Sequence, residues 1–572
     1  MFFDFLTYND IQHIIVIKLC FFLFLGLCLW GIYKRCRGWW FVFLVSIFSS
    51  FTYLVFVNNL GLPLWGLKGD EITITAMYEM MAHGAMFRDF AYPNLPAFYP
   101  PLWFSFFGLI GKIFSWNGIF IGKFAAASTF LLLPAVFYAL QVYFWGKQKS
   151  ASLPGPVAWL FSSLALFVVF DWHVVVSKPY EVVSACLIVL WTLFFLYDLW
   201  HKKISLKRGL VYSVTGGLLF MVFYFWFFLV ALGITFFHLL YKRVSLRKYV
   251  SLCIVGLGIL LVSAPFWYPL FESYRVLGSE NWTLGYFLLS GVATHGPLLT
   301  YSISSLVLLF GLVSLIVYRK HFVPRILLSL FVAQYVWHIM GLVTLLVLSY
   351  PMQEAKGVYY FHRVVLLLGA AYGVERLWIY CKKRFSYKHK VWTRSVVLIG
   401  VCVLSTQLFF GFTVDDVHLQ ERRSLSRSLD SDMQDLISFL DDTNDTVHRV
   451  TLHSGISEIS AFLPTNTFIY YNAHNSHPAA RFSERLSVVD ALTRMTDPES
   501  FFELTQHNGI TPITRFIFFA EEEKGYPLYF HVDDFPHTAK EVTMYISPSV
   551  FSPDYFSEVY RSKRFVVYES NK

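Results

Sequence analysis

The sequence predicts a polytopic α-helical membrane protein that ends in a separate α/β domain. Of its 572 residues, 56% are hydrophobic, 19% aromatic and only 15% charged, whereas about a quarter of the residues of a soluble domain are charged. Apolar runs near the length that crosses a bilayer recur from residue 11 to residue 413. Acidic residues then become frequent, beginning with Asp415 and Asp416. We therefore expect a membrane domain at 1–413 and an extracytoplasmic domain at 414–572.

The membrane part is expected to contain about 11–13 transmembrane helices. The apolar runs lie at 11–33, 39–60, 118–145, 155–177, 181–200, 209–224, 225–241, 249–271, 298–318, 325–348, 361–380 and 393–413. The two runs within 209–241 are short, so a broken or re-entrant hairpin around Tyr224 is the alternative there. Residues 102–116 are apolar but too short for a span, which predicts a helix lying at the membrane interface.

Lysine and arginine indicate the orientation of these spans. Alternate loops hold 22 such residues and the intervening loops hold 6. Because cytoplasmic loops are enriched in Lys and Arg, the basic set is expected in the cytoplasm of a plasma-membrane protein. The large loop 61–101 and residues 414–572 are then expected outside the cell. The basic loops lie at 34–37, 147–149, 202–208, 242–248, 319–325 and 382–394.

Several functions are excluded or unsupported by the composition. The net charge of +9 sits largely in short loops between apolar runs, so no nucleic acid is expected as a partner. No Cys or His spacing suggests a zinc site, and neither a GxxxxGK[ST] nor a strand-linked GxGxxG phosphate loop occurs. No metal and no cofactor are expected, and a divalent cation has no support in the sequence.

The first exterior loop holds the most informative carboxylates. Asp70 and Glu71 follow a span directly, at a boundary where a carboxyl pKa can be raised enough to accept a proton from a sugar hydroxyl. The alternative is that Asp70 caps a helix over 72–83 while Glu71 meets water. Asp89 is a further candidate base in the same loop.

Aromatic residues and prolines follow Asp89 over 90–103. Tyr92, Tyr99 and Trp103 can stack on sugar rings, or they can anchor the loop at the headgroup level as an aromatic belt does. A loop of this length usually has a functional role. We therefore expect these three residues to contact a sugar.

Cations are scarce in the exterior loops, so those present are candidate ligands of a lipid phosphate. They are Arg88, Lys178, Lys356, His362 and Arg363. Lys178 can equally snorkel and pair with Glu181 for structural reasons alone. Asp171 and His173 are expected to face the same exterior pocket as Lys178.

The C-terminal domain is expected to be α/β, with helices at 431–442, 484–495 and 498–507 and strands at 516–520, 526–532, 542–546 and 565–568. Its densest polar and aromatic cluster is 470–478, whose residues suit carbohydrate contact or an Asx-capped turn. The candidate sugar-binding residues there are Tyr471, Asn472, His474 and His477.

Three segments carry a resemblance to a known family. They are Arg88–Trp103, the Lys178-Pro179-Tyr180-Glu181 element, and the pair formed by 463–478 and 532–536. In this order they are similar to the galactan 5-O-arabinofuranosyltransferases of mycolic-acid bacteria, from about residue 60 to the C-terminus. The resemblance implies the C-type membrane glycosyltransferase fold and a decaprenylphosphoryl-arabinofuranose donor. It also implies Asp70 and Glu71 at the acidic position, Asp89 as a second candidate, and Lys178 near the donor phosphate.

The expected activity is therefore transfer of a sugar, implied to be arabinofuranose, from a polyprenyl-phosphate donor to cell-wall galactan in arabinogalactan biosynthesis. A polyprenyl-phosphate-dependent glycosyltransferase for another wall or surface glycan is the first alternative. A lipid-linked sugar transporter or flippase is the second, although it should place ionisable groups near the middle of broken helices. A non-catalytic scaffold for wall assembly would tolerate the loss of all three loop carboxylates.

Overall fold

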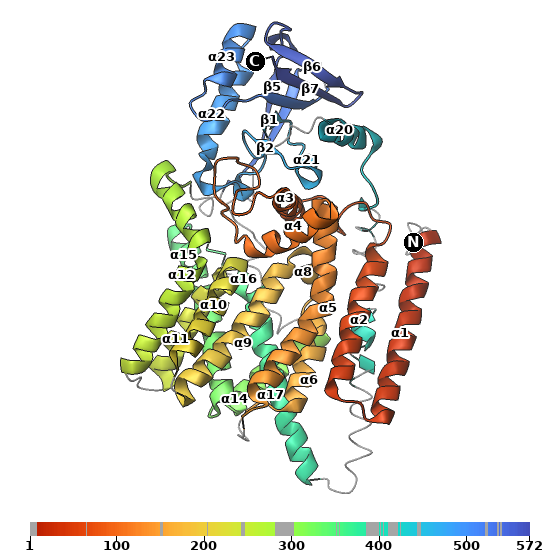
Figure 1. Ribbon diagram of the computed structural model, residues 1–572, viewed down its shortest axis with the longest axis vertical. Helices are drawn as coiled ribbons and strands as arrows, with labels where there is room; N and C mark the ends of the chain where they lie inside the picture. The colour runs from red at the N-terminus through yellow and green to blue at the C-terminus, as the bar shows by residue number, and fades with distance from the viewer. Residues whose placement is uncertain are drawn as a thin grey trace.

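A helical bundle forms one part of the molecule, and a mixed α/β domain caps one end of it (Figure 1). Helices α3 (Asp70–Ala82) and α4 (Leu102–Phe114) lie between the two parts, and α1 begins at the capped end. The computed structural model describes residues 8–64, 66–148, 153–202, 204–241, 246–280, 302–350, 352–353, 355–384, 425–442, 448–520, 524–534 and 540–571, with isolated positions and short stretches between 400 and 423 and at 537.

Seven helices of the described part are long and apolar enough to cross a bilayer. Much of α1 and α12 is exposed, including Leu19 and Phe22 on α1 and Leu257 and Leu261 on α12, as expected of faces that meet lipid. The chain is a multi-pass membrane protein. The seven helices are α1 (Tyr8–Lys34), α2 (Gly38–Val57), α5 (Gly118–Trp145), α9 (Pro179–His201), α12 (Leu246–Leu277), α15 (Phe322–Leu348) and α17 (Phe361–Arg384).

The other expected spans have different outcomes. Residues 303–317 form the shorter apolar helix α14 (Ile303–Val317). The region 209–241 forms two helices, α10 (Leu206–Val222) and α11 (Phe225–Tyr241). Arg208 at the start of α10 pairs with Asp198 near the end of α9 (3.9 Å), and Phe237 of α11 packs on Trp200 of α9. The start of α10 and the end of α11 thus both lie beside the end of α9, so the two helices are antiparallel. The run 393–413 lies mostly outside the described residues.

Residues 155–177 do not form the single span that their composition predicts. Three short helices replace it, α6 (Pro156–Leu164), α7 (Leu166–Val169) and α8 (Trp172–Ser177). Arg363 of α17 donates to the Val169 carbonyl oxygen (2.6 Å) and pairs with Asp171 (3.1 Å). The break is tolerated because Arg363 of the neighbouring helix satisfies the Val169 carbonyl oxygen and the Asp171 carboxylate.

Close packing of small residues holds part of the bundle together. A Cβ on Gly311 of α14 would collide with the Leu366 carbonyl oxygen, and a Cβ on Gly373 of α17 would collide with Ser314. These glycines therefore allow the two helix backbones to approach closely, as in other membrane bundles.

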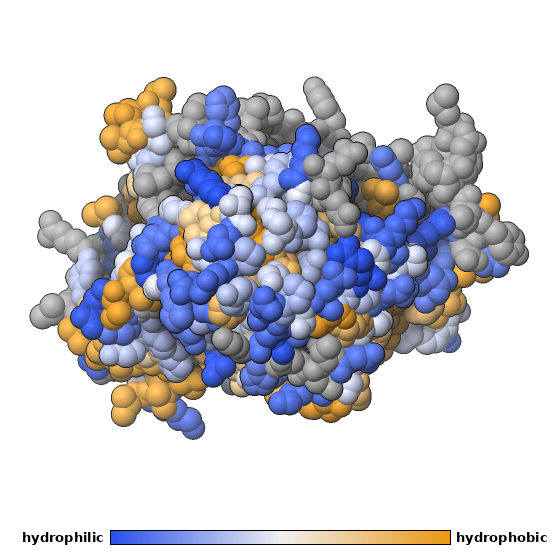
Figure 2. All heavy atoms as spheres, turned by 90° about the horizontal axis from the view of Figure 1, so that it is seen from above, coloured by the Kyte–Doolittle hydropathy of each residue, from blue (hydrophilic) through white to orange (hydrophobic). Residues whose placement is uncertain are grey.

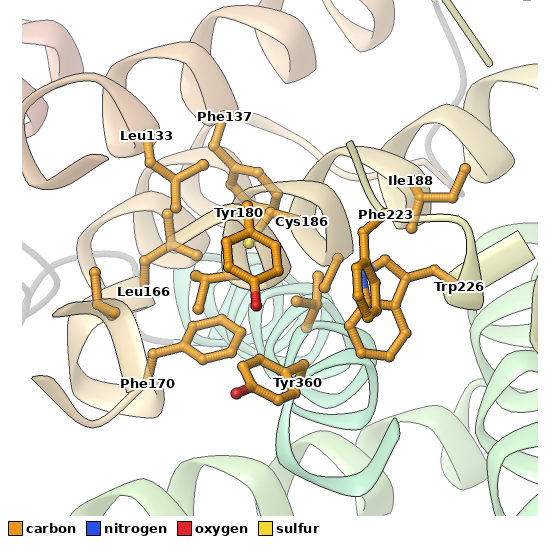
Figure 3. Packing of buried hydrophobic residues seen from close by; sticks show 14 of the residues in the cluster. Leu133, Phe137, Leu166, Phe170, Tyr180, Cys186, Ile188, Phe223, Trp226 and Tyr360 are labelled. Carbon is orange, nitrogen blue, oxygen red and sulfur yellow. The ribbon is translucent and has the colours of Figure 1, made fainter. Parts of the chain in front are cut away.

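The apolar core of the bundle extends to the end that faces the C-terminal domain (Figure 1). Figure 3 shows Phe137, Tyr180, Phe223, Trp226 and Tyr360 in one packed cluster. The rings of Trp226 and Tyr360 lie 5.8 Å apart, and those of Tyr180 and Phe223 lie 6.0 Å apart. Since Tyr180 and Tyr360 follow Lys178 and Lys356 closely in the chain, this core determines where the two lysines emerge.

The C-terminal domain is built on a five-stranded sheet in the order β2-β1-β3-β7-β6. Strand β1 is parallel to β2 and β3, whereas β7 is antiparallel to β3 and β6. A separate antiparallel hairpin is formed by β4 (Tyr526–Val532) and β5 (Lys540–Ile546). The strands of the main sheet are β1 (Val450–His453), β2 (Asn466–Thr467), β3 (Arg515–Phe519), β6 (Phe556–Arg561) and β7 (Phe565–Ser570).

Helices cover both faces of this sheet. Ile517 and Val567 pack with α20 (Ser431–Asp442) and α21 (Ile459–Phe462), whereas Phe516 and Val566 pack with α22 (Phe482–Thr493) and α23 (Pro498–Gln506). The predicted α/β class is confirmed, and each predicted helix and strand is found within two residues. Strands β1, β2 and β6 were not predicted. The first two are very short, and β6 is largely exposed and polar.

The loop 61–101 joins the bundle to the C-terminal domain. Thr467 N donates to the Ala91 carbonyl oxygen (2.8 Å), and Gly61 N donates to that of Arg427 (2.6 Å). On the bundle side, Glu79 of α3 accepts a hydrogen bond from Gly118 N at the start of α5 (2.5 Å). Viewed from the domain end, the molecule is largely hydrophilic over the domain, with apolar residues toward the rim (Figure 2).

Candidate active site

Asp70 lies in the first turn of α3, immediately after Gly69. Gly69 has φ +56° and ψ −126°, a conformation that favours glycine. No side-chain hydrogen bond caps this helix. Instead, the Asp70 carboxylate contacts Lys178. The interpretation of Asp70 as a helix cap is therefore wrong.

The Asp70–Lys178 ion pair joins α3 to the residue that precedes α9. Asp70 Oδ2 lies 2.6 Å from Lys178 Nζ, and the two side chains are 47% and 25% exposed, respectively. Lys178 does not form the alternative pair with Glu181, because Glu181 binds Lys356 instead. Two elements far apart in the sequence thus meet through opposite charges.

The second ion pair, Lys356–Glu181, is more deeply buried. Glu181 is fully buried in the first turn of α9 and lies 3.1 Å from Nζ of Lys356, the first residue of α16 (Lys356–Tyr359). The Lys356 ammonium also lies 4.7 Å from the ring centroid of Phe223. Tyr180 donates a hydrogen bond to Glu181 (3.3 Å). Loss of Lys356 would leave the buried Glu181 charge uncompensated.

A cavity of about 640 Å³ lies beside Asp70 and Lys178, within the range of small-molecule sites. Glu71 of α3 and His173 of α8 line it as well, and so do Glu421 and Leu425, which lead into the C-terminal domain. Within the described residues, no group of three or more His, Cys, Asp or Glu could hold a metal ion. The polar lining consists of Lys68, Asp70, Glu71, His173, Ser177, Lys178, Tyr359, Tyr360 and Glu421.

The charge of Lys178 controls the protonation of Asp70. Burial alone would raise the pKa of the Asp70 carboxyl, but the Lys178 ammonium, with Lys356, holds this pKa below its ordinary value. The raised pKa expected from the sequence is therefore wrong for this state of the protein. Asp70 is ionised at neutral pH, which is the form that accepts a proton, yet its basicity is reduced as long as Lys178 is its partner.

A turn of the C-terminal domain lies close to this ion pair. Asp70, Lys356 and Lys178 all act electrostatically on His474, and burial lowers the pKa of His474 to about 4. The His474 ring is therefore neutral at pH 7. Asn472 caps the turn η3 (Ala473–Asn475) by accepting from His474 N (3.0 Å), and Tyr471 O accepts from His531 N of β4 (2.8 Å). The Asx-capped turn is thus present.

Comparison with known protein families identifies the chain. A family model described as arabinofuranosyltransferase N terminal matches residues 13–352, which is more than half of the chain. The chain belongs to this family. It is a membrane glycosyltransferase, as the sequence predicted.

Solved structures agree with the fold of this glycosyltransferase. The structure of ArnT from Cupriavidus metallidurans bound to undecaprenyl phosphate is 15% identical, with a TM-score of 0.51 over 93% of this chain and 98% of that chain. The arabinofuranosyltransferase AftD from Mycobacteria is 12% identical, with a TM-score of 0.47 over 92% of this chain and 40% of that chain. No curated protein sequence matches. The predicted C-type glycosyltransferase fold is confirmed.

Two predicted residues of the glycosyltransferase do not line the cavity. Asp89 is 3% exposed, and its Oδ1 accepts from the backbone N–H groups of Ala91 and Tyr92 (2.9 Å each). Burial raises the pKa of Asp89 to about 7, although these hydrogen bonds oppose the shift. Arg88 is exposed and lies outside the cavity lining. Asp89 therefore organises the loop backbone.

The predicted aromatic residues hold parts of the structure together. Tyr92 is buried, and its hydroxyl lies 2.6 Å from Ser476 Oγ in the C-terminal domain. Trp103 donates to the Tyr78 hydroxyl (2.7 Å). Of these three residues, Tyr99 lies nearest the two ion pairs, because its hydroxyl lies 3.1 Å from that of Tyr180, which binds Glu181. Tyr92 therefore binds the loop to the C-terminal domain, and Trp103 binds α4 to α3.

Three further predicted ligands lie elsewhere. His362 is fully buried beside Phe331 and Tyr335. Arg363 is engaged by Asp171 and the Val169 carbonyl oxygen, so Asp171 does not share the cavity with His173. His477 is buried, and its Nδ1 accepts from Ala479 N (2.9 Å).

The sequence did not indicate five polar residues that line the cavity, namely Lys68, Ser177, Tyr359, Tyr360 and Glu421. A signal existed for the two tyrosines, because they lie between Lys356 and Arg363, which are both predicted phosphate ligands. Glu421 offered no such signal, since it is one of many acidic residues at the start of the C-terminal segment.

Proposed function

We propose that this protein transfers arabinofuranose from a polyprenyl-phosphate donor to cell-wall galactan. The observation that carries this proposal is that Asp70 pairs with Lys178 at the edge of one cavity, while Lys356, held by Glu181 outside the cavity lining, acts electrostatically on Asp70. The proposal requires that a lipid phosphate enter this cavity from the membrane and that a polymer enter it from the aqueous side. Membership of the arabinofuranosyltransferase family supports the sugar, and the undecaprenyl phosphate of the similar ArnT structure supports the donor class.

The proposed mechanism is a single displacement. An acceptor hydroxyl oxygen attacks the anomeric carbon, and the bond from that carbon to the phosphate oxygen breaks. The electron pair leaves with the polyprenyl phosphate, while the hydroxyl proton passes to Asp70. Lys178 and Lys356 would stabilise the departing phosphate. The configuration at the anomeric carbon is inverted.

Among the loop carboxylates, the geometry favours Asp70 as the base. Glu71 lines the same cavity and is the second candidate. Asp89 is the weakest candidate, because its Oδ1 is used by two backbone N–H groups and the residue is almost fully buried. Of the candidate acceptor residues, Tyr471 and His474 both interact electrostatically with Asp70.

We propose that the cavity and the C-terminal domain lie outside the cell. The most basic loops lie in the alternate set expected to be cytoplasmic. Ser487 is exposed on α22 and Lys207 is exposed at the start of α10. In a background without native cysteines, a cysteine replacing Ser487 should react with an impermeant maleimide in intact cells, whereas one replacing Lys207 should react only after lysis. The reverse pattern would contradict this orientation.

A membrane assay tests the proposed activity. Membranes containing the chain are offered polyprenylphosphoryl arabinofuranose or polyprenylphosphoryl mannose, each with galactan fragments or with another wall glycan. We expect one pentose to be added to galactan, as read by product mass. Pentose addition only to another glycan would overturn the acceptor assignment, and transfer of mannose alone would overturn the donor assignment. Lipid movement across the membrane without any glycan product would indicate the flippase alternative.

A further inference from the structure

The lysines that flank Asp70 already have carboxylate partners. Lys178 is held by Asp70 and Lys356 is held by Glu181. Lys68, which also lines the cavity, is exposed to water. A phosphate that enters the cavity must therefore compete with a carboxylate before it can bind either of these partly exposed lysines.

The two ion pairs differ in how easily they open. Glu181 is fully buried, so withdrawal of Lys356 would leave a carboxylate in an apolar site. Asp70 is about half exposed and borders the cavity, so water can solvate its carboxylate when Lys178 leaves. Lys178 is therefore the exchangeable cation and Lys356 the fixed one.

We propose that the donor phosphate displaces Asp70 from Lys178, so that binding of the donor releases Asp70 to act as the base. This inference rests on the proposed function. It makes the reaction ordered: the donor binds first, and the acceptor meets a competent base only afterwards. Without donor, Asp70 remains neutralised by Lys178 and the cavity is inactive toward acceptor hydroxyls.

The surroundings of Asp70 favour this exchange. Glu71 on α3 and Glu421 line the same cavity and carry like charge. Once Lys178 has turned to the phosphate, these carboxylates and the phosphate itself raise the pKa of Asp70. Lys356 on α16 opposes this rise, whereas His474 is neutral. The other titratable groups of the lining are Lys68, His173, Tyr359 and Tyr360.

The same exchange explains how the product leaves. After transfer, Asp70 carries the acceptor proton and no longer attracts Lys178, which stays with the polyprenyl phosphate. When Asp70 loses this proton to water, it recovers its charge and competes for Lys178 again. Polyprenyl phosphate should therefore inhibit competitively with respect to the donor.

The pH dependence of transfer tests the exchange in the purified chain in lipid nanodiscs. The acid limb of kcat/KM for the donor reports Asp70 in the free enzyme, and that of kcat reports it with donor bound. We expect the kcat limb to lie higher by about 1 pH unit or more. In Lys178→Met the separation of the two limbs should shrink, because only the charge of the bound phosphate then raises the pKa of Asp70. The donor KM should rise roughly 10- to 100-fold.

Lys68→Met is the matched control, because it removes a cation from the same cavity that does not neutralise Asp70. It should weaken donor binding while the two acid limbs remain separate. Lys178→Arg should restore both the separation and much of the donor affinity. Coincident limbs in the wild type, or an undiminished separation in Lys178→Met, would overturn the exchange.

A binding measurement separates this inference from the proposed activity. Calorimetry with polyprenyl monophosphate alone, in two buffers of different ionisation enthalpy, reports protons taken up on binding. At mildly acidic pH the wild type should take up more protons than Asp70→Asn. If uptake is equal in both, the exchange is overturned even though arabinofuranose is transferred. If uptake differs but no arabinofuranose is transferred, the proposed function fails while the exchange stands.

Discussion

Replacement of Asp70 by asparagine separates a catalytic role from a structural one. The amide keeps the size of the side chain and removes its negative charge. It therefore breaks the 2.6 Å ion pair with Lys178 and eliminates the proposed base without creating a cavity. The variant should insert and accumulate as the wild type does, yet lose nearly all transfer activity.

The magnitudes of the two effects differ widely. Because Asp70 is 47% exposed and Lys178 is 25% exposed, their ion pair is screened by water, and its loss should destabilise the fold by about 1 kcal/mol or less. Loss of a general base lowers a rate by roughly 10²–10⁴, which corresponds to about 3–5.5 kcal/mol in the activation barrier. The activity loss therefore cannot come from reduced stability alone.

Asp89→Asn provides the matched control, since the same chemical change is made in the same loop at a residue that lies outside the cavity. Initial rates of transfer and thermal unfolding midpoints should be measured for both variants and for Glu71→Gln. We expect Asp70→Asn to be nearly inactive, Glu71→Gln to be milder, and Asp89→Asn to retain activity. Near-wild-type turnover of Asp70→Asn would refute the assignment of the base. Activity in all three variants would refute the displacement mechanism itself.

Three further outcomes are expected. Burial raises the pKa of Asp89 to about 7 in the folded protein, whereas its pKa in the unfolded chain is about 4. The folded state therefore binds the Asp89 proton more tightly. The resulting stabilisation, at most about 4 kcal/mol, is fully present below about pH 4 and is lost as pH rises through 7. Thermal unfolding should show Asp89→Asn gaining on the wild type as pH rises from 5 to 8, and parallel curves would argue against it. Lys356→Met should destabilise the chain by about 3–5 kcal/mol, because it leaves the fully buried Glu181 unpaired, and the added change Glu181→Gln should restore much of this loss. An undiminished unfolding temperature in the single variant would contradict the buried pair. Tyr471→Ala with His474→Ala should raise the acceptor KM and leave donor binding unchanged, whereas an unaltered acceptor dependence would remove this turn from the acceptor site.

Much of the fold could be predicted from the sequence because its signals are local. Apolar length indicated most of the spans, and alternating or amphipathic patterns located the larger elements of the C-terminal domain. The break within 155–177 could not be predicted in this way. It depends on Arg363, a residue nearly two hundred positions away that satisfies Val169 and Asp171.

The candidate site was predictable in composition but not in pairing. Its position directly after a span pointed to Asp70, and the scarcity of exterior cations pointed to Lys178 and Lys356. The structure places Lys178 in contact with Asp70 and brings Lys356 close enough to act on it electrostatically. Which carboxylate binds which lysine depends on the packing of α3, α9 and α16, so the sequence suggested the wrong partner for Lys178 and the wrong direction for the pKa of Asp70. The aromatic residues were the least informative about the site. Tyr92 and Trp103 form internal hydrogen bonds, and their sequence pattern does not distinguish this structural role from stacking on a sugar.

The anomeric configuration of the product tests the central claim most directly. The purified chain is given polyprenylphosphoryl arabinofuranose of known configuration and a short galactan acceptor, and the new linkage is examined by NMR. A single displacement assisted by Asp70 predicts that every product linkage is inverted relative to the donor and that Asp70→Asn forms almost none. A product with retained configuration, or one formed equally well without the Asp70 carboxylate, would contradict the account.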